Sequence, residues 1–268
     1  MMLRSKQVRR CKYLIRLLES GAQQLLRSCT AELSPAGASA SLVVYGLALA
    51  REVLRTSSNP IAQHLLVRAL WNTTGHLAWL VSDSSCLNQR FDSLVSDYHA
   101  RSDEWMRHAK NGLGKDSFEQ MSKLAGIDPT SKAEASSQPQ DRTWRHVCSK
   151  ELESALEALL TSVCTSPGNN SGEVTSLTEI NQRLALARRD GDHFAHPNLV
   201  AIFDLLGLID PETKSIRTRV PKDARQPKLI LTWTEGLLFA QAAAIHSQWP
   251  ESLDLPSVLD WLGSSTVE

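Results

Sequence analysis

The stretch from Gln182 to Val200 reads QRLALARRDGDHFAHPNLV and carries most of the chemical signal in the chain. Its leucines predict a helix that ends in paired arginines, where cations suit the negative end of the helix dipole. The Asp-Gly-Asp sequence at 190–192 predicts a break in that helix. Pro197 then suits the first position of a second helix. We therefore expect a junction of two helices that gathers charged and titratable side chains: Arg188, Arg189, Asp190, Asp192, His193 and His196.

Outward from this junction, apolar residues recur at intervals of three and four, which predicts helices and no extended sheet. The expected fold class is all-α, an up-and-down helical bundle. We divide the chain into a basic N-terminal helical extension over 1–35, a single bundle domain over 36–250, and a short C-terminal helix and tail over 251–268. The helices are expected near 11–29, 42–56, 60–81, 87–105, 141–163, 180–189, 197–206, 229–248 and 256–262.

Local signals fix several boundaries. Asn59 before Pro60 predicts an N-cap followed by proline at the first helical position. Ser176 and Glu179 have the spacing of a capping box at the start of the helix that leads into the junction. The segment 112–140 is rich in Gly, Ser, Pro and Gln and is expected to be a mobile loop. Alternation over 215–220 predicts a small β-hairpin near 207–227.

The charge composition limits which partners the sequence indicates. Twenty-nine basic and twenty-nine acidic residues give a formal charge of zero, so no global field indicates nucleic acid or an anionic membrane as partner. Residues 1–27 nevertheless carry seven basic residues against Glu19, a local net charge of +6. This end could contact RNA or an acidic partner, and a solvated helix face is the simpler interpretation.

Five widely spaced cysteines on mostly apolar positions are typical of reduced thiols, so we expect a cytoplasmic protein. The N-terminus lacks the apolar run of a signal peptide. The longest apolar runs, 42–50 and 229–245, are too short or are interrupted by Glu235, and we expect no membrane span. No cofactor is indicated.

A polar strip lies on the helix expected over 60–81, and its members fall at spacings of three and four: His64, Arg68, Asn72, Gly75 and Trp79. Arg51 and Glu52 on the preceding helix are candidate partners, and we predict that Arg68 is partly buried and paired with Glu52. A buried arginine needs such a partner. We favour a polar network that orients helices, and keep a ligand-binding wall of Arg51, Glu52, His64 and Arg68 as the alternative.

The junction itself has three interpretations. In the first, an arginine and a histidine on opposite sides of the helix break converge on a phosphate. Histidine titrates near neutral pH and can move the proton of a ribose 2′-hydroxyl, while arginine binds the phosphate with a bidentate fork. Arg189 with His196, six residues between them, and Arg188 with His193, four residues between them, are the candidate pairs. Asp190 is the polar residue that follows Arg189.

This arrangement resembles the HEPN superfamily, whose signature is an arginine, four to six residues, and a histidine, usually with a polar residue after the arginine. The resemblance implies an all-helical fold and, as in many members, a metal-independent endoribonuclease of a bacterial toxin–antitoxin or phage-defence system. A looser resemblance to HEPN-like families with an early Arg/Glu helix and a late His-Pro junction covers about 42–248. The insertions at 112–140 and 207–227 depart from the compact ribonucleases. The resemblance also implies three kinds of partner: RNA, a protein partner or antitoxin, and a second copy of the chain in a homodimer.

The second interpretation is a metal site made by Asp190, Asp192, His193 and His196, but no second cluster supplies a closed shell of ligands. We therefore assign no metal site. In the third interpretation His196 caps the helix that Pro197 opens and the arginines neutralise the end of the preceding helix. The chain would then be a catalytically silent interaction or RNA-binding module.

Overall fold

The computed structural model describes residues 2–29, 34–56, 59–96, 111–112, 116–117, 119–120, 147–164, 184–189, 192 and 227–254. Over these ranges the chain is almost entirely helical and contains no strand, which confirms the all-α class. The following expected features lie outside the described residues: the hairpin up to residue 226, most of the 112–140 loop, the Ser176–Glu179 capping box, and the helices over 197–206 and 256–262.

The chain divides into two compact units, one made of Met1–Ser84 with Ser149–Glu268 and the other of Ser85–Cys148. In the second unit residues 87–96 are helical, as the spacing of their apolar residues predicts. The first unit contains every helix named below. This division differs from the expected one, because the N-terminal helix belongs to the same unit as the rest of the bundle.

Helix α1 (Met2–Ser28) is a core helix rather than an extension. Its stripe at intervals of three and four is buried, as predicted: Cys11, Leu14, Leu18, Ala22 and Leu25. This stripe packs against the neighbouring helices α2 and α8. Burial beside Glu235 raises the pKa of the Cys11 thiol to about 12. Cys148, just before α6 (Ser149–Cys164), is exposed.

Helix α2 (Pro35–Arg55) begins earlier than the predicted Leu42, because Ser34 caps it and Pro35 takes the first helical position. The Ser34 hydroxyl accepts from the Gly37 amide at 3.0 Å. Among the described residues this is the one helix long and apolar enough to cross a membrane, and half of its most apolar window is buried inside the protein. Its packing against α1, α3 and α8 accounts for that apolar composition.

Helix α3 (Pro60–Val81) starts and ends where the sequence predicts. Asn59 caps it by accepting from the amide of Ala62 at 3.1 Å. Its buried face carries the large side chains of the bundle centre, among them Leu70, Trp71 and Leu77.

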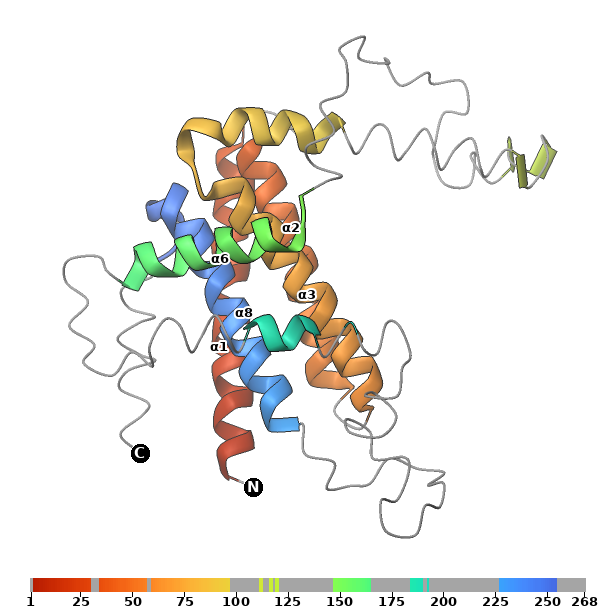
Figure 1. Ribbon diagram of the computed structural model, residues 1–268, viewed down its shortest axis with the longest axis vertical. Helices are drawn as coiled ribbons and strands as arrows, with labels where there is room; N and C mark the ends of the chain where they lie inside the picture. Colours follow the sequence, from red (N-terminus) through yellow and green to blue (C-terminus); the bar gives the residue numbers. More distant parts are fainter. Residues whose placement is uncertain are drawn as a thin grey trace. The chain divides into compact units, whose positions relative to one another are not determined.

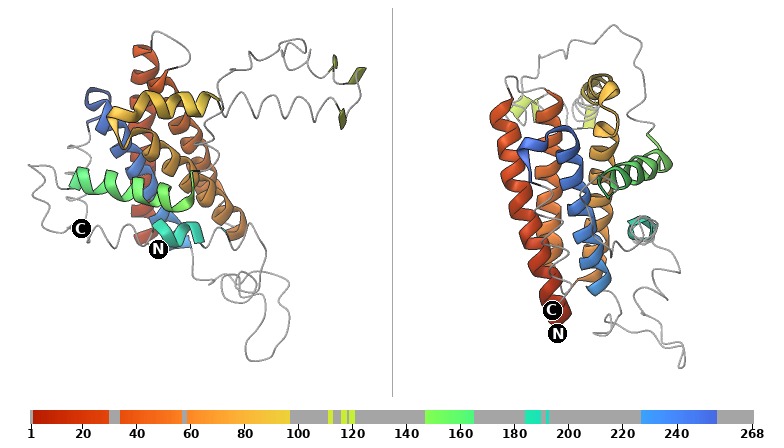
Figure 2. Two further views of the ribbon diagram at one scale, coloured as in Figure 1. Left: turned by 45° about the horizontal axis from the view of Figure 1, so that its top comes forward. Right: turned by 90° about the vertical axis from the view of Figure 1, so that its left-hand side faces the viewer.

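Helix α8 (Pro227–Gln248) is buried along most of its length and is followed by the short 3-10 helix η3 (Pro250–Ser252). In the contacts between α3 and α8, the residue numbers increase together along both helices: His64 contacts Trp233, Thr74 contacts Gln241, and Val81 contacts Gln248. The two helices are therefore parallel. Figure 1 and Figure 2 show α1, α2, α3 and α8 side by side, with α2 running opposite to the other three.

The four-helix core thus departs from a simple up-and-down alternation, because α8 is parallel to α3. Helix α6 (Ser149–Cys164) crosses α3 and α8 (Figure 1). Gly75 of α3 allows the close crossing, because a Cβ there would lie 3.1 Å from Cβ of Leu152. This crossing brings α6 beside the polar strip of α3.

Candidate functional site

The structure describes six of the nine predicted site residues: Arg51, Glu52, His64, Arg68, Arg188 and Arg189. Asp190, His193 and His196 lie outside the described residues, so the arginine–histidine pairs stay predictions. Asp192, expected in the helix break, is itself helical.

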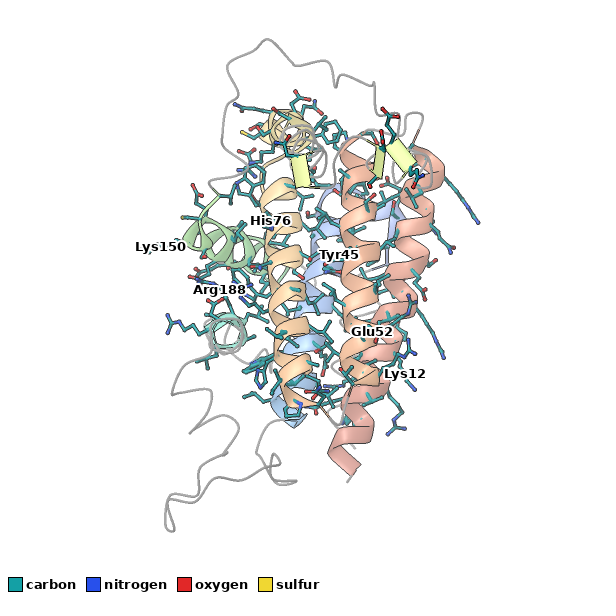
Figure 3. The ribbon with its side chains drawn as sticks, turned by 90° about the vertical axis from the view of Figure 1, so that its right-hand side faces the viewer. Lys12, Tyr45, Glu52, His76, Lys150 and Arg188 are labelled. Carbon is teal, nitrogen blue, oxygen red and sulfur yellow. The ribbon has the colours of Figure 1, made fainter. Side chains whose placement is uncertain are left out.

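The helix over 184–189 docks on the bundle through Leu184 and Ala187, which are buried. Leu184 contacts α8 beside Gly236. A Cβ at Gly236 would lie 3.3 Å from Cδ2 of Leu184. Arg188 follows the buried Ala187 and lies on the side of the bundle (Figure 3). Arg189, one position on, is exposed. Helical periodicity thus turns the two neighbouring arginines to different environments.

Arg188 forms the centre of a network of ion pairs. Its Nη1 donates to Oε1 of Glu153 on α6 at 2.9 Å, and its Nε lies 3.6 Å from Oδ2 of Asp192. Nε of Arg68, on α3, donates to the other oxygen of the same carboxylate, Oδ1, at 2.5 Å. We name these four residues, Arg68, Glu153, Arg188 and Asp192, the arginine cluster. Its two cations and two anions balance.

Trp71 of α3 forms the apolar side of the arginine cluster. The guanidinium carbon of Arg188 lies 5.5 Å from the centroid of the Trp71 ring, a cation–π distance. The ring is buried, and its Nε1 has no hydrogen-bond partner among the described residues. Arg188 is therefore held by an aromatic face as well as by two carboxylates, with 26% of its side chain exposed.

The predicted pairing of Arg68 with an acid is confirmed, and so is its partial burial, with 32% of the side chain exposed. The predicted partner is wrong. Glu52 instead pairs with Arg55 one turn along α2, and Arg51 pairs with Glu19 of α1. Both α2 side chains lie on the outer face of that helix, as Glu52 does in Figure 3, because its inner face is apolar core.

His64 also departs from the proposed binding wall. It is fully buried and meets the ring of Trp233 edge to face, with centroids 5.9 Å apart. Its neighbour Gln63 is buried as well and donates to the Val53 carbonyl at 2.9 Å. The polar strip thus splits into a core histidine and a half-exposed arginine, which favours the interpretation as a network that orients helices.

The chemistry open to the arginine cluster is limited by its internal pairing. Moving Arg188 to an external phosphate would leave the partly buried Glu153 without its partner, and moving Arg68 would remove one of the two cations that compensate Asp192. No group of three His, Cys, Asp or Glu side chains that could hold a metal ion exists within the described ranges. The interpretation that 190–196 forms a metal site concerns residues outside those ranges.

Of the two arginines of the junction, Arg189 is the one whose guanidinium no described carboxylate occupies. It is exposed and has no ion pair with any described residue. Glu153 and Trp71, in contrast, are site residues that sequence reasoning missed. Glu153 occupies an ordinary partly exposed position of α6, and only the crossing of α6 over α3 brings it to Arg188.

Comparison with protein-family models, with curated proteins and with solved structures yields no match to this chain.

Proposed function

We propose that this chain is a HEPN-like endoribonuclease of a bacterial toxin or phage-defence system, in which Arg189 binds the scissile phosphate and His196 transfers the proton. The observation that carries the proposal is the difference between two adjacent arginines. Arg188 is neutralised by Glu153 and Asp192, whereas Arg189 is exposed and has no partner among the described residues.

This difference selects between the two predicted pairs. A guanidinium that stabilises developing charge on a phosphate needs hydrogen-bond donors that are not already occupied by carboxylates. Arg189 meets that condition and is followed by the polar Asp190, as in the HEPN motif. Arg188 instead attaches its helix to α6 and α3. We therefore assign catalysis to Arg189 with His196 and remove Arg188 with His193 from the catalytic set.

The reaction that we propose needs no metal. Histidine takes the proton of the ribose 2′-hydroxyl, the 2′-oxygen attacks the adjacent phosphorus, and the bond from phosphorus to the 5′-oxygen of the next nucleotide breaks. The 5′-oxygen leaves with the proton that the imidazolium returns. Arg189 stabilises the charge that develops on the phosphate. The products are a 2′,3′-cyclic phosphate and a free 5′-hydroxyl.

The test uses the full chain with a labelled RNA, with and without EDTA. We expect cleavage that survives EDTA and leaves 2′,3′-cyclic phosphate ends. Arg189→Gln and His196→Ala should each lower the rate by about 10²- to 10⁴-fold. Lys150→Gln is the matched control, because Lys150 is another exposed cation on a different helix, and the rate should not change. Cleavage that persists in both variants, or stops with EDTA, would sink the proposal.

A catalytically silent interaction module is the second candidate, and the internal neutrality of the arginine cluster favours it. A network in which every charge is paired inside the protein locks helices together and leaves no chemistry. Under this alternative the wild-type chain cleaves no RNA, and His196→Ala costs about 1 kcal/mol of unfolding free energy as a lost cap. The partner would be a protein such as an antitoxin, or a second copy of the chain.

A further inference from the structure

The outer face of α1 carries a row of cations that the candidate site does not use. Arg9, Lys12 and Arg16 are exposed and follow one another at intervals of three and four residues, so they share one side of the helix. Lys12 lies at the outer edge of α1 in Figure 3. None of the three has an ion pair with a described residue. We name Arg9, Lys12 and Arg16 the basic face.

Two acids near the basic face, Glu19 and Glu235, are already paired with other arginines. Glu19, the sole acid of α1, binds Arg51 of α2, and Glu235 of α8 binds Arg10 on a different side of α1. The side chains of Arg10 and Glu235 are mostly buried, whereas the basic face is open to solvent. Within the described part of the chain no acid pairs with this positive charge, so the basic face can attract an external anion.

The opposite side of α1 excludes insertion into a bilayer. The apolar stripe that would enter the lipid, including Cys11, Leu14 and Leu18, is fully buried against α2 and α8. A helix that binds a membrane by insertion needs that stripe free. The three side chains of the basic face are cationic, so they suit contact with a hydrated polyanion without insertion.

We propose that the basic face binds the phosphodiester backbone of single-stranded RNA, as a docking surface separate from the junction. The choice of RNA rests on the proposed function, while the surface itself rests on exposure and charge. Arg9 and Arg16 are seven residues apart, about 10 Å along a helix, so the row can contact successive phosphates. Such contacts release counterions from the RNA and add affinity without reading sequence.

The experiment measures binding of a fluorescein-labelled mixed-sequence single-stranded RNA by anisotropy as salt is varied. It uses the full chain carrying Arg189→Gln, which blocks cleavage under the proposed function. Adding Arg9→Gln, Lys12→Gln and Arg16→Gln should lower the salt slope, d log K/d log[salt], by roughly 2 in magnitude. At about 0.1 M salt each lost contact weakens binding about fivefold, or roughly 100-fold for all three.

Two lysines supply the matched control. Lys12→Gln removes a cation from the basic face, and Lys150→Gln removes one from α6, at the opposite edge of Figure 3. Both side chains are exposed. We expect weaker binding from the first substitution alone, with helix content and Tm unchanged in both. Equal effects of the two, or an unchanged Kd in the triple variant, would overturn the basic face as an RNA site.

A gain of binding gives an independent check. Ser20 is exposed and lies one turn beyond Arg16, so Ser20→Lys extends the row and should raise both affinity and the salt slope. Vesicles of phosphatidylserine test the membrane alternative, and binding to vesicles without binding to RNA would overturn the proposal. RNA binding through this face without cleavage by the wild-type chain would refute the proposed function and leave the docking surface standing.

Discussion

Arg68 donates a hydrogen bond to Asp192, which lies 124 residues further along the chain. Arg188 lies near the other oxygen of the same carboxylate and also binds Glu153. Asp192 therefore connects α3, a helix of the central bundle, to the junction that contains Arg188 and Arg189. The network attaches the helical segment to α3 and α6, and it explains why two arginines can lie in a partly buried place.

Arg68→Met should destabilise the protein by about 1–2 kcal/mol. The pair with Asp192 is more buried than a surface ion pair, worth about 0.2–1 kcal/mol, and less buried than a core pair, whose disruption costs about 3–5 kcal/mol. Arg188 near Asp192 compensates part of the loss. Urea unfolding of the wild type and the variant measures the difference.

A surface pair supplies the control for Arg68. Arg55 binds Glu52 one turn away with 78% of its side chain exposed, so Arg55→Met should cost less than about 0.5 kcal/mol. The double variant Arg68→Met with Asp192→Leu should recover part of the loss. Equal effects of Arg68→Met and Arg55→Met would refute the ion pair with Asp192.

Arg188→Met should also lower the unfolding free energy, by about 1–3 kcal/mol, because it leaves Glu153 without its partner and removes the cation from the Trp71 ring. Arg189→Met should change it by less than about 0.5 kcal/mol, since that side chain is exposed. A double-mutant cycle between Arg188→Met and Glu153→Gln should give a coupling energy above about 0.5 kcal/mol. Additive effects would show that the pair contributes nothing.

Helix periodicity and caps predict much of this fold. The apolar stripe of α1, the Asn59 cap of α3 and the extent of α8 follow from local sequence, because each depends on residues within a few turns. Apolar periodicity places the start of α2 too late, because the helix begins with the cap formed by Ser34 and with Pro35, which precede its apolar stretch. The parallel direction of α8 is a tertiary property that local periodicity does not contain.

The candidate site was predictable only in part. Spacing along α3 correctly indicates that Arg68 is half-buried and needs an acid. It cannot choose the acid, because Glu52 is near in sequence while Asp192 becomes near only after the chain folds back. Spacing also placed His64 and Arg68 on one strip, although one turn of helix separates a core position from a half-exposed one.

The buried Glu235 predicts a dependence of stability on pH. Burial raises its pKa above the ordinary value of 4.5, against the opposing effect of Arg10 and Lys6. The folded state therefore holds the proton more tightly than the unfolded state. The free energy of unfolding should fall as pH rises from 4.5 through the raised pKa, and Glu235 adds no further change above it.

Glu235→Gln provides the comparison, because it keeps the shape of the side chain and removes its titration. Urea unfolding at a series of pH values should show that the free energy of unfolding of the wild type declines across this range. The Glu235→Gln variant should lack this decline. Glu19→Gln is the control, as that acid is half-exposed and pairs with Arg51 at the surface. A wild-type and Glu235→Gln difference that does not vary with pH would contradict the raised pKa.

The close crossing of α2 and α8 gives the last prediction. A Cβ at Gly46 would lie 2.9 Å from Cδ of Gln241, a fully buried side chain whose Nε2 donates to Thr74 at 3.0 Å. Gly46→Ala should therefore displace the amide, break that hydrogen bond and cost about 1–3 kcal/mol, more than the gain of about 1 kcal/mol from helix propensity. Gly236→Ala in α8 is the matched control, because its Cβ meets only Cδ2 of Leu184 at 3.3 Å, and it should be neutral or stabilising. Thermal unfolding of the two variants tests the crossing, and a stabilising Gly46→Ala would mean that Gln241 does not occupy this place.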